Sequence, residues 1–168
     1  MDNDKRKMRH RHINIANVRN EYVHRIPDGK EKQMKWTYGN INQVFQHELK
    51  LISTNTHYIS VNSLDAMRTT ISHALGGDDK FFYMRIYPYP HQLLREHGLL
   101  GVAKAERISK GMKRSFGKTQ SKVALVHPDQ TIISLKVDEP LLKLARYALD
   151  IASKKLACAS VVVESNVS

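Results

Sequence analysis

The sequence predicts an α+β fold: a two-layer single domain with two strand-helix-strand halves, a basic helix and loop between them, and a basic N-terminal arm. Two segments with helical spacing of apolar residues, each flanked by short β-prone runs, indicate the two halves. The 168 residues are enough for one domain with a sizeable core. We therefore expect an arm over residues 1–40 and the α+β domain over residues 41–165.

The first forty residues show little periodicity, and a Pro-Asp-Gly turn signal lies at 27–29. Residues 1–50 carry 11 basic and 6 acidic side chains, which is typical of an arm that becomes ordered on a partner. Trp36 and Tyr38 could stack on bases or pack against the domain itself. His10 and His12 lack the further ligands that a closed metal site needs, so we expect no metal.

In the first half, the alternation over residues 46–53 and 57–61 predicts two strands that form a hairpin. A helix should follow, with Ser63 as its N-cap and an apolar stripe of Leu64, Met67, Ile71, Ala74 and Leu75. Gly76 and Gly77 should end it. Residues 81–87 are strongly β-prone and predict a central strand closed by Pro88 and Pro90.

In the second half, residues 122–127 and 131–137 predict a hairpin around Pro128-Asp129-Gln130. A long helix should span 139–155, with Pro140 in its first turn and apolar residues at 141, 145, 148, 152 and 156. Residues 159–164 predict the last strand, with Cys158 as a small buried residue at its head. A single cysteine excludes an internal disulfide and suits a reducing compartment.

Positive charge is concentrated between the halves. Residues 80–122 hold 10 basic and 2 acidic side chains, a net +8 of the chain's +11. Residues 51–79 carry a net −2 and residues 123–168 a net charge of zero, so both are expected to be scaffold. Because unpaired like charges repel one another, the surplus predicts a polyanionic partner.

The cationic segment contains a predicted helix and an apolar loop. Ile108, Met112 and Phe116 recur every four residues and share one side of the helix, and Gly117 suits its C-terminal end. Residues 96–105 before it hold leucine and valine between glycines, without strand alternation. An apolar loop of this kind is costly on a soluble protein unless a partner covers it.

Several classes of function do not fit the sequence. No run of about 18 apolar residues predicts a membrane span, and residues 1–12 lack the apolar centre of a secretory signal. No nucleotide-binding, metalloprotease or hydrolase motif occurs. Asp78 and Asp79 fall in a turn, and nothing near His91 is spaced to orient it as a base, so we interpret His91 as an RNA or packing contact. We expect neither catalysis nor a cofactor.

Two motifs carry a resemblance to a known family. Residues 89–96 (YPHQLLRE) and 105–118 (AERISKGMKRSFGK) resemble the universal large-subunit ribosomal protein sixteen family, in its archaeal and eukaryotic ten-e type. Residues 19–23 with 26–27 resemble the family's arm, and residues 148–164 its last helix and strand, so that the resemblance covers about residues 15–165. The chain departs from the family at Lys104, where glycine is usual, at Glu106, where aspartate is usual, and over residues 1–12.

The resemblance implies a cytoplasmic, ribosome-bound structural protein that binds large-subunit rRNA beside the aminoacyl-tRNA site, near the peptidyl transferase centre. Its implied partners are that rRNA, tRNA at the aminoacyl and peptidyl sites and other large-subunit proteins, with no membrane and no homo-oligomer. The rRNA contacts that it implies are Arg85, His91, Arg95, Arg107, Lys110, Lys113, Arg114 and Lys118, with Arg19, Arg25, Lys30 and Lys35 on the arm.

The same resemblance implies that a loop over residues 97–106 reaches toward the acceptor ends of bound tRNAs. Its tRNA-proximal residues are His97, Gly98, Leu99, Leu100, Gly101, Val102, Ala103 and Lys104. Because side chains do not reach into the deep groove of A-form RNA, we expect recognition of shape and backbone. The alternative is a basic RNA-binding or RNA-chaperone module that works off the ribosome and shares these electrostatics.

Overall fold

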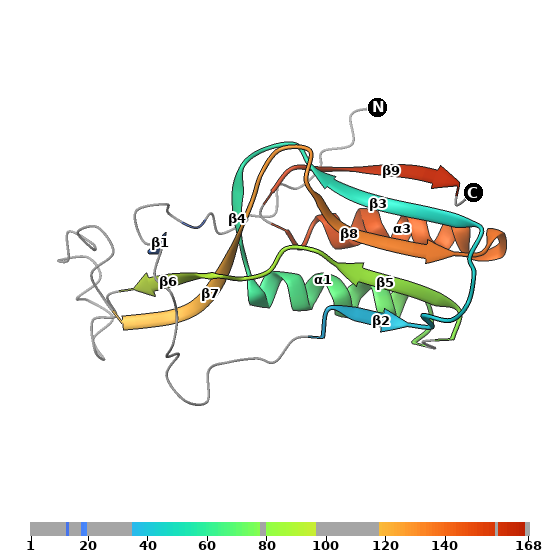
Figure 1. Cartoon of the computed structure of the whole chain (residues 1–168), viewed down its shortest axis with the longest axis horizontal. Coiled ribbons are helices and arrows are strands. Elements are labelled where there is room, and N and C mark those ends of the chain that lie inside the picture. Colours follow the sequence, from blue (N-terminus) through green and yellow to red (C-terminus); the bar gives the residue numbers. More distant parts are fainter. Residues whose placement is uncertain are drawn as a thin grey trace, which may run out of the picture.

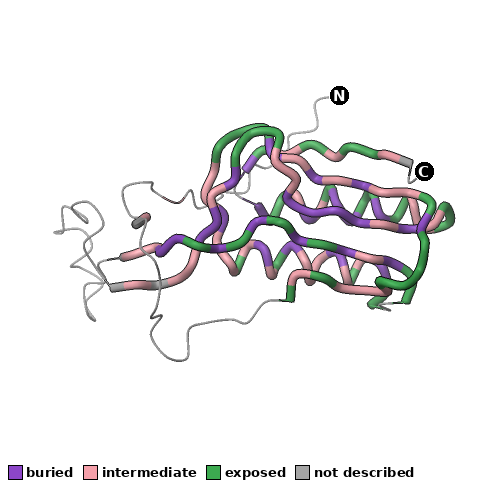
Figure 2. Tube along the Cα trace, in the orientation of Figure 1, coloured by how far each residue is buried: buried purple, intermediate pink, exposed green. Residues whose placement is uncertain are grey.

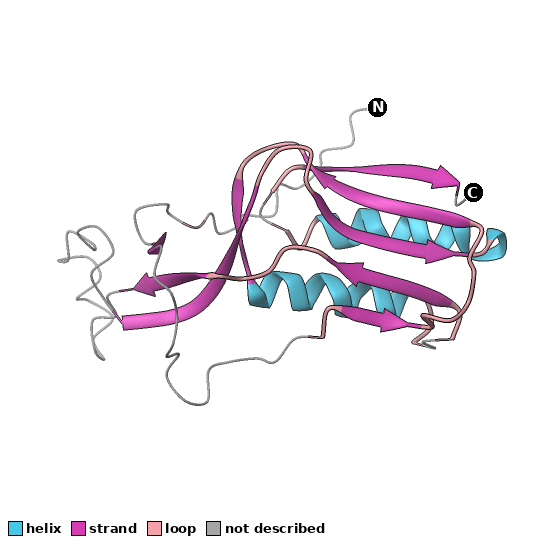
Figure 3. Ribbon diagram, viewed as in Figure 1, coloured by secondary structure: helices cyan, strands magenta, loops and turns pink. Residues whose placement is uncertain are grey.

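The computed structural model describes residues 13, 18–19, 35–77, 80–96, 118–156 and 158–166. Within these ranges, a five-stranded antiparallel sheet carries two α-helices on one of its faces, and a four-stranded antiparallel sheet extends from one end (Figures 1 and 3). The predicted α+β class is thereby confirmed. The two helices are α1 (Val61–Ala74) and α3 (Leu142–Ser153), the second preceded by the 3-10 turn η2 (Glu139–Leu141).

The five-stranded sheet has the order β2-β5-β8-β3-β9. Its strands are β2 (Thr37–Gly39), β5 (Phe82–Ile86), β8 (Thr131–Val137), β3 (His47–Ser53) and β9 (Ser160–Asn166). The strand predicted as central over 81–87 is β5, which is an interior strand of this sheet. The central position belongs to β8, because β8 pairs with both β5 and β3.

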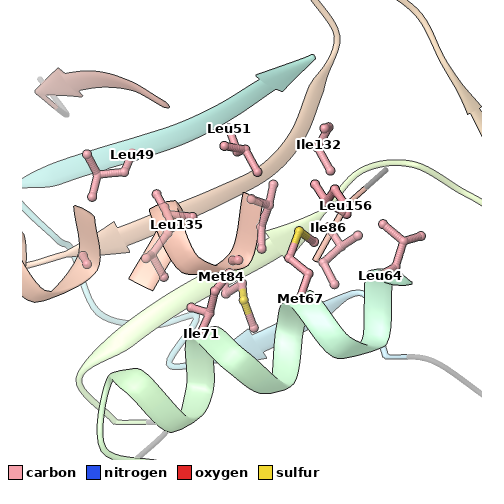
Figure 4. Close-up of a cluster of buried hydrophobic side chains, with 14 of the residues drawn as sticks. Leu49, Leu51, Leu64, Met67, Ile71, Met84, Ile86, Ile132, Leu135 and Leu156 are labelled. Carbon is pink, nitrogen blue, oxygen red and sulfur yellow. The ribbon is translucent and has the colours of Figure 1, made fainter. Parts of the chain in front are cut away.

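The core lies between this sheet and the two helices (Figures 2 and 4). The predicted stripe of α1 faces it, since Leu64, Met67 and Ile71 are fully buried. Alternate residues of the strands meet that stripe, because side chains on a strand point to opposite faces in turn. The buried side chains from the sheet and α3 include Leu49, Leu51, Met84, Ile86, Leu135, Ala145, Leu149 and Ala152.

The first helix begins earlier than predicted. Ser60 is its N-cap, and the Ser60 Oγ accepts a hydrogen bond of 3.2 Å from the backbone N–H of Ser63, which was the predicted cap. Both serines fit the preference for this position, and the extended backbone of Ser60 decides between them. The first turn of α1 therefore contains no acidic residue, and Asp65 lies in the second turn.

Both predicted hairpins are wrong. In the first, strand β4 (His57–Ser60) pairs with β7 (Lys118–Val126) and not with β3. In the second, β7 pairs with β4 and β6 (Gln92–Glu96), whereas β8 pairs with β3 and β5. The connections after β3 and before β8 pass between the two sheets side by side (Figure 1). The Asp129 N–H donates to the carbonyl oxygen of Ser53 at 2.8 Å, and the Ser53 N–H donates to that of Gln130 at 3.0 Å, so the two bends hold each other.

Strand β2 lies within residues 1–40, the range predicted as an arm, yet it is an edge strand of the five-stranded sheet. Trp36 and Tyr38 pack against the core, which is the second of the two roles considered for them. Gly39 has a φ of 89°, and a Cβ at this position would overlap the carbonyl oxygen of Phe82. Glycine is therefore needed for β2 to approach β5 this closely.

Candidate nucleic-acid interface

The four-stranded sheet, with the order β1-β6-β7-β4, positions both ends of residues 97–117, which form the middle of the cationic segment over 80–122. Glu96 at the end of β6 pairs with Lys118 at the start of β7, and the ladder continues to Gln92 and Val123. Paired residues of an antiparallel ladder lie about 5 Å apart. Residues 97–117 consequently begin and end at one point on the sheet.

A two-residue strand of the predicted arm joins the same sheet. Strand β1 (Val18–Arg19) pairs with β6, with Arg19 opposite Leu93 and Val18 opposite Leu94. Sequence analysis did not predict this pairing, because two residues are too few to give a strand pattern. Two cationic regions that are far apart in the sequence thus meet in one sheet.

The predicted rRNA contacts fall into three groups. Arg85 is exposed on β5 of the five-stranded sheet, and its Cζ lies 5.2 Å from the centroid of the Tyr87 ring. Arg95 is half-buried on β6, His91 is exposed just before that strand, and Lys35 is exposed ahead of β2. Arg19 in β1 and Lys118 in β7 join Arg95 in the second group, on the four-stranded sheet. The third group lies outside the described residues: Arg25, Lys30, Arg107, Lys110, Lys113 and Arg114. The predicted tRNA-proximal residues also lie outside them: His97, Gly98, Leu99, Leu100, Gly101, Val102, Ala103 and Lys104.

The connection between β5 and β6 joins the two sheets. Pro88 and Pro90 are buried along it, while Tyr87 and Tyr89 are 43% and 63% exposed. The Tyr89 ring lies 5.4 Å from that of Trp36, and the Nδ1 of His91 lies 3.0 Å from the carbonyl oxygen of Tyr89. Because proline fixes φ, the two prolines stiffen this connection and hold the tyrosines at the surface.

Two cations that no sequence pattern singled out, Lys50 and Lys136, join Arg85. Ser134 of β8 pairs with Arg85 on one side and with Lys50 of β3 on the other, and Lys136 lies two residues along β8. Cross-strand partners share a face of the sheet, as do residues two apart on one strand. Lys50, Arg85 and Lys136 therefore lie on the face opposite the helices, although Lys136 comes from a segment of zero net charge.

The remaining chemistry of the described residues is limited. Burial raises the pKa of the Cys158 thiol above its ordinary value, and a hydrogen bond with Ser53 offsets part of that rise. The prediction of a small buried cysteine is confirmed, since Cys158 is 6% exposed. Over the part of the chain that the structure describes, no three His, Cys, Asp or Glu side chains gather as a possible metal site, and no helix could span a membrane.

Comparison with known proteins gives a consistent result. The sequence model described as ribosomal protein L16p/L10e matches residues 15–163. The large ribosomal subunit protein uL16 of Saccharolobus solfataricus is 40% identical over an alignment of 146 residues that covers 84% of this chain and 80% of that protein. The proteins of the same name from Saccharolobus islandicus and Picrophilus torridus are 38% and 35% identical, with the same shares covered.

Proposed function

The chain belongs to the L16p/L10e family of ribosomal proteins, and from that premise we propose that it is a structural constituent of the large ribosomal subunit. We infer that it binds large-subunit rRNA beside the aminoacyl-tRNA site, near the peptidyl transferase centre, and helps to position tRNA. Its partners are then that rRNA, the bound tRNAs and other large-subunit proteins, and its location is the cytoplasmic ribosome.

The observation that carries the RNA-binding proposal is the anchoring of the cationic segment. Ten basic and two acidic residues occur over 80–122, and the ladder between β6 and β7 brings the two ends of residues 97–117 together. The pairing of β6 with β7 fixes where residues 97–117 start and end, so less conformational entropy is lost when these residues bind RNA than if their ends were free. Arg19 enters the same sheet and adds positive charge from the arm.

Basic side chains at this site act by neutralising phosphates and releasing the counterions condensed on them, which supplies most of the affinity. If about six to ten phosphates are neutralised, the affinity for rRNA should fall roughly 10³–10⁵-fold between about 50 and 200 mM salt. The role requires no bond to be made or broken, so the proposal includes no catalytic step.

Sedimentation separates ribosomal association from work off the ribosome. We expect the tagged full chain to migrate with large subunits through a sucrose gradient after a high-salt wash, because a protein enclosed by rRNA and neighbouring proteins in an assembled subunit dissociates slowly even where salt weakens its phosphate contacts. Recovery of the chain only in the light fractions would support the alternative, a basic RNA-binding or RNA-chaperone module.

A double substitution tests the cationic segment directly. Lys113→Ala with Arg114→Ala should weaken binding to a large-subunit rRNA fragment and reduce the slope of log affinity against log salt by about two, one for each lost phosphate contact. Lys154→Ala with Lys155→Ala is the matched control, since these exposed neighbours directly follow α3 and Lys154 already pairs with Asp150 at 2.9 Å. Equal loss in both variants would contradict the proposed site.

A further inference from the structure

The five-stranded sheet has one face covered by the helices and one face without them (Figures 1 and 3). We call the second the open face, and define it by Tyr83, Arg85 and Tyr87 from β5 and its following residue, Ser134 and Lys136 from β8, Glu48 and Lys50 from β3, and Val161 and Val163 from β9. Antiparallel sheets often leave one face to water, but such a face is then mainly polar. Here tyrosines, cations and valines occupy it.

The charge of the open face is positive. The five strands contain two acids, and one of them, Glu164, pairs with Arg146 of α3 and so belongs to the helix side. The other, Glu48, pairs with Lys50 at 3.1 Å. Arg85, Lys50 and Lys136 on this face therefore meet one carboxylate, Glu48.

The cations of the open face lie around Ser134. Arg85 and Lys50 flank Ser134 in one cross-strand row, and Lys136 lies in the next row between Tyr83 and Glu48. Adjacent strands lie about 4.8 Å apart, so the backbones of Arg85 and Lys50 are separated by roughly 10 Å. Ser134 between them is 1% exposed. A row of cations with this spacing suits successive phosphates of an extended strand.

Tyr87 supplies a held aromatic ring beside these cations. Its hydroxyl lies 3.3 Å from the Ser134 Oγ, and the guanidinium of Arg85 lies over its ring. The residue is nevertheless 43% exposed. Tyr83, which lies on the same face and pairs with Lys136, is half-buried. Aromatic rings on a sheet, together with nearby cations, are the features by which RNA-binding sheets stack unpaired bases and hold their phosphates.

We propose that the open face binds an unpaired segment of RNA, with a base stacked on Tyr87 and neighbouring phosphates on Arg85, Lys50 and Lys136. The inference rests on the proposed function, because it takes RNA as the partner. It adds a second RNA surface, separate from residues 97–117, and a preference for unpaired nucleotides. An acidic protein segment would satisfy the cations but would not use a ring held in this way.

The test uses the full chain and a short oligoadenylate that contains one 2-aminopurine, whose fluorescence falls when the base stacks. Wild-type protein should bind it and quench the fluorescence. Tyr87→Leu should lower the affinity roughly five- to hundredfold and abolish the quenching, the effect typical of losing one base-stacking ring. Tyr87→Phe keeps the ring and should retain both. Tyr147→Leu, which removes a 61% exposed tyrosine from α3, is the matched control and should change neither.

A second variant tests the same surface in case Tyr87→Leu does not fold. Lys136→Glu reverses one charge at a half-exposed position, and it should weaken oligoadenylate binding at least about tenfold at low salt, since a cationic contact is replaced by a repulsive one. Urea unfolding of each variant shows whether the fold is kept.

The outcomes separate this inference from the proposed function. Unchanged oligoadenylate binding by Tyr87→Leu and Lys136→Glu would overturn the inference and leave a protein segment as the occupant of the open face. Binding of the rRNA fragment but not of oligoadenylate by the wild type would overturn it as well, with the proposed function intact. Failure of the wild type to bind either RNA would overturn both.

Discussion

Arg68 of α1 connects β2, a strand within the range predicted as an arm, to the rest of the domain. Its Cζ lies 4.8 Å from the centroid of the Tyr38 ring on β2, and its Nε and Nη2 donate to the Oδ1 of Asp65 at 3.1 and 3.0 Å. The carboxylate thus holds the guanidinium over the ring. We expect Arg68→Ala to destabilise the protein by loosening this edge of the sheet.

The size of the effect follows from the burial of the group. The Arg68 side chain is 26% exposed, so its cation–π interaction lies between the exposed and desolvated cases, at about 1 kcal/mol. The pair with Asp65, three residues away on the helix, adds about 0.3–0.5 kcal/mol. Arg68→Ala should therefore cost about 1–2 kcal/mol, which is roughly 2–6 °C in Tm for a chain of this length.

A double-mutant cycle isolates the cation–π part. Urea unfolding of the wild type, Arg68→Ala, Tyr38→Leu and the double variant gives the coupling free energy, which should be about 0.5–1 kcal/mol. Lys154→Ala removes an exposed ion pair from α3 and is the control, expected to cost less than about 0.5 kcal/mol.

Two results would refute this reasoning. A coupling free energy below about 0.3 kcal/mol would mean that the ring and the guanidinium act independently. A loss in Arg68→Ala no larger than that in Lys154→Ala would mean that Arg68 makes no measurable contribution to holding β2.

Three further predictions concern the backbone, the first helix and the buried thiol. Gly39→Ala should cost clearly more than the about 1 kcal/mol expected for Gly76→Ala in thermal unfolding, because both have a φ of 89° but only the first Cβ would overlap the Phe82 carbonyl; equal losses would contradict this. Ser60→Ala should reduce the free energy of unfolding by about 0.5–2 kcal/mol through loss of the N-cap. An unchanged free energy in urea unfolding would show that another residue caps the helix. The pKa of Cys158 is raised above 9.0, so above that pH the unfolded state releases the thiol proton first and stability falls as pH rises, by at most about 1.4 kcal/mol per pH unit. The difference between wild type and Cys158→Ala should show this slope, and parallel pH profiles would exclude it.

The candidate interface was predictable in part. The surplus of ten basic over two acidic residues in 80–122 is a property of composition, and it indicated a polyanion before any contact was known. The open face was not predictable in this way. Lys50 shares β3 with Glu48, Lys136 belongs to residues 123–168 with a net charge of zero, and both meet Arg85 only because β3, β8 and β5 are neighbours in the sheet.

The sequence by itself determined where most of the elements lie, apart from β1, β2 and β6, and which side of α1 and β3 faces the core. The stripe of Leu64, Met67 and Ile71 and the alternation along β3 are local patterns, and local patterns set the period and the buried face. Only the tertiary structure decided the partners of the strands. Two strands joined by a short loop pair with each other unless contacts distant in sequence stabilise another arrangement, and here the hydrogen bonds between Ser53 and the turn at 129–130 turn both connections from one sheet to the other. That choice depends on residues more than seventy positions apart, which no local pattern records.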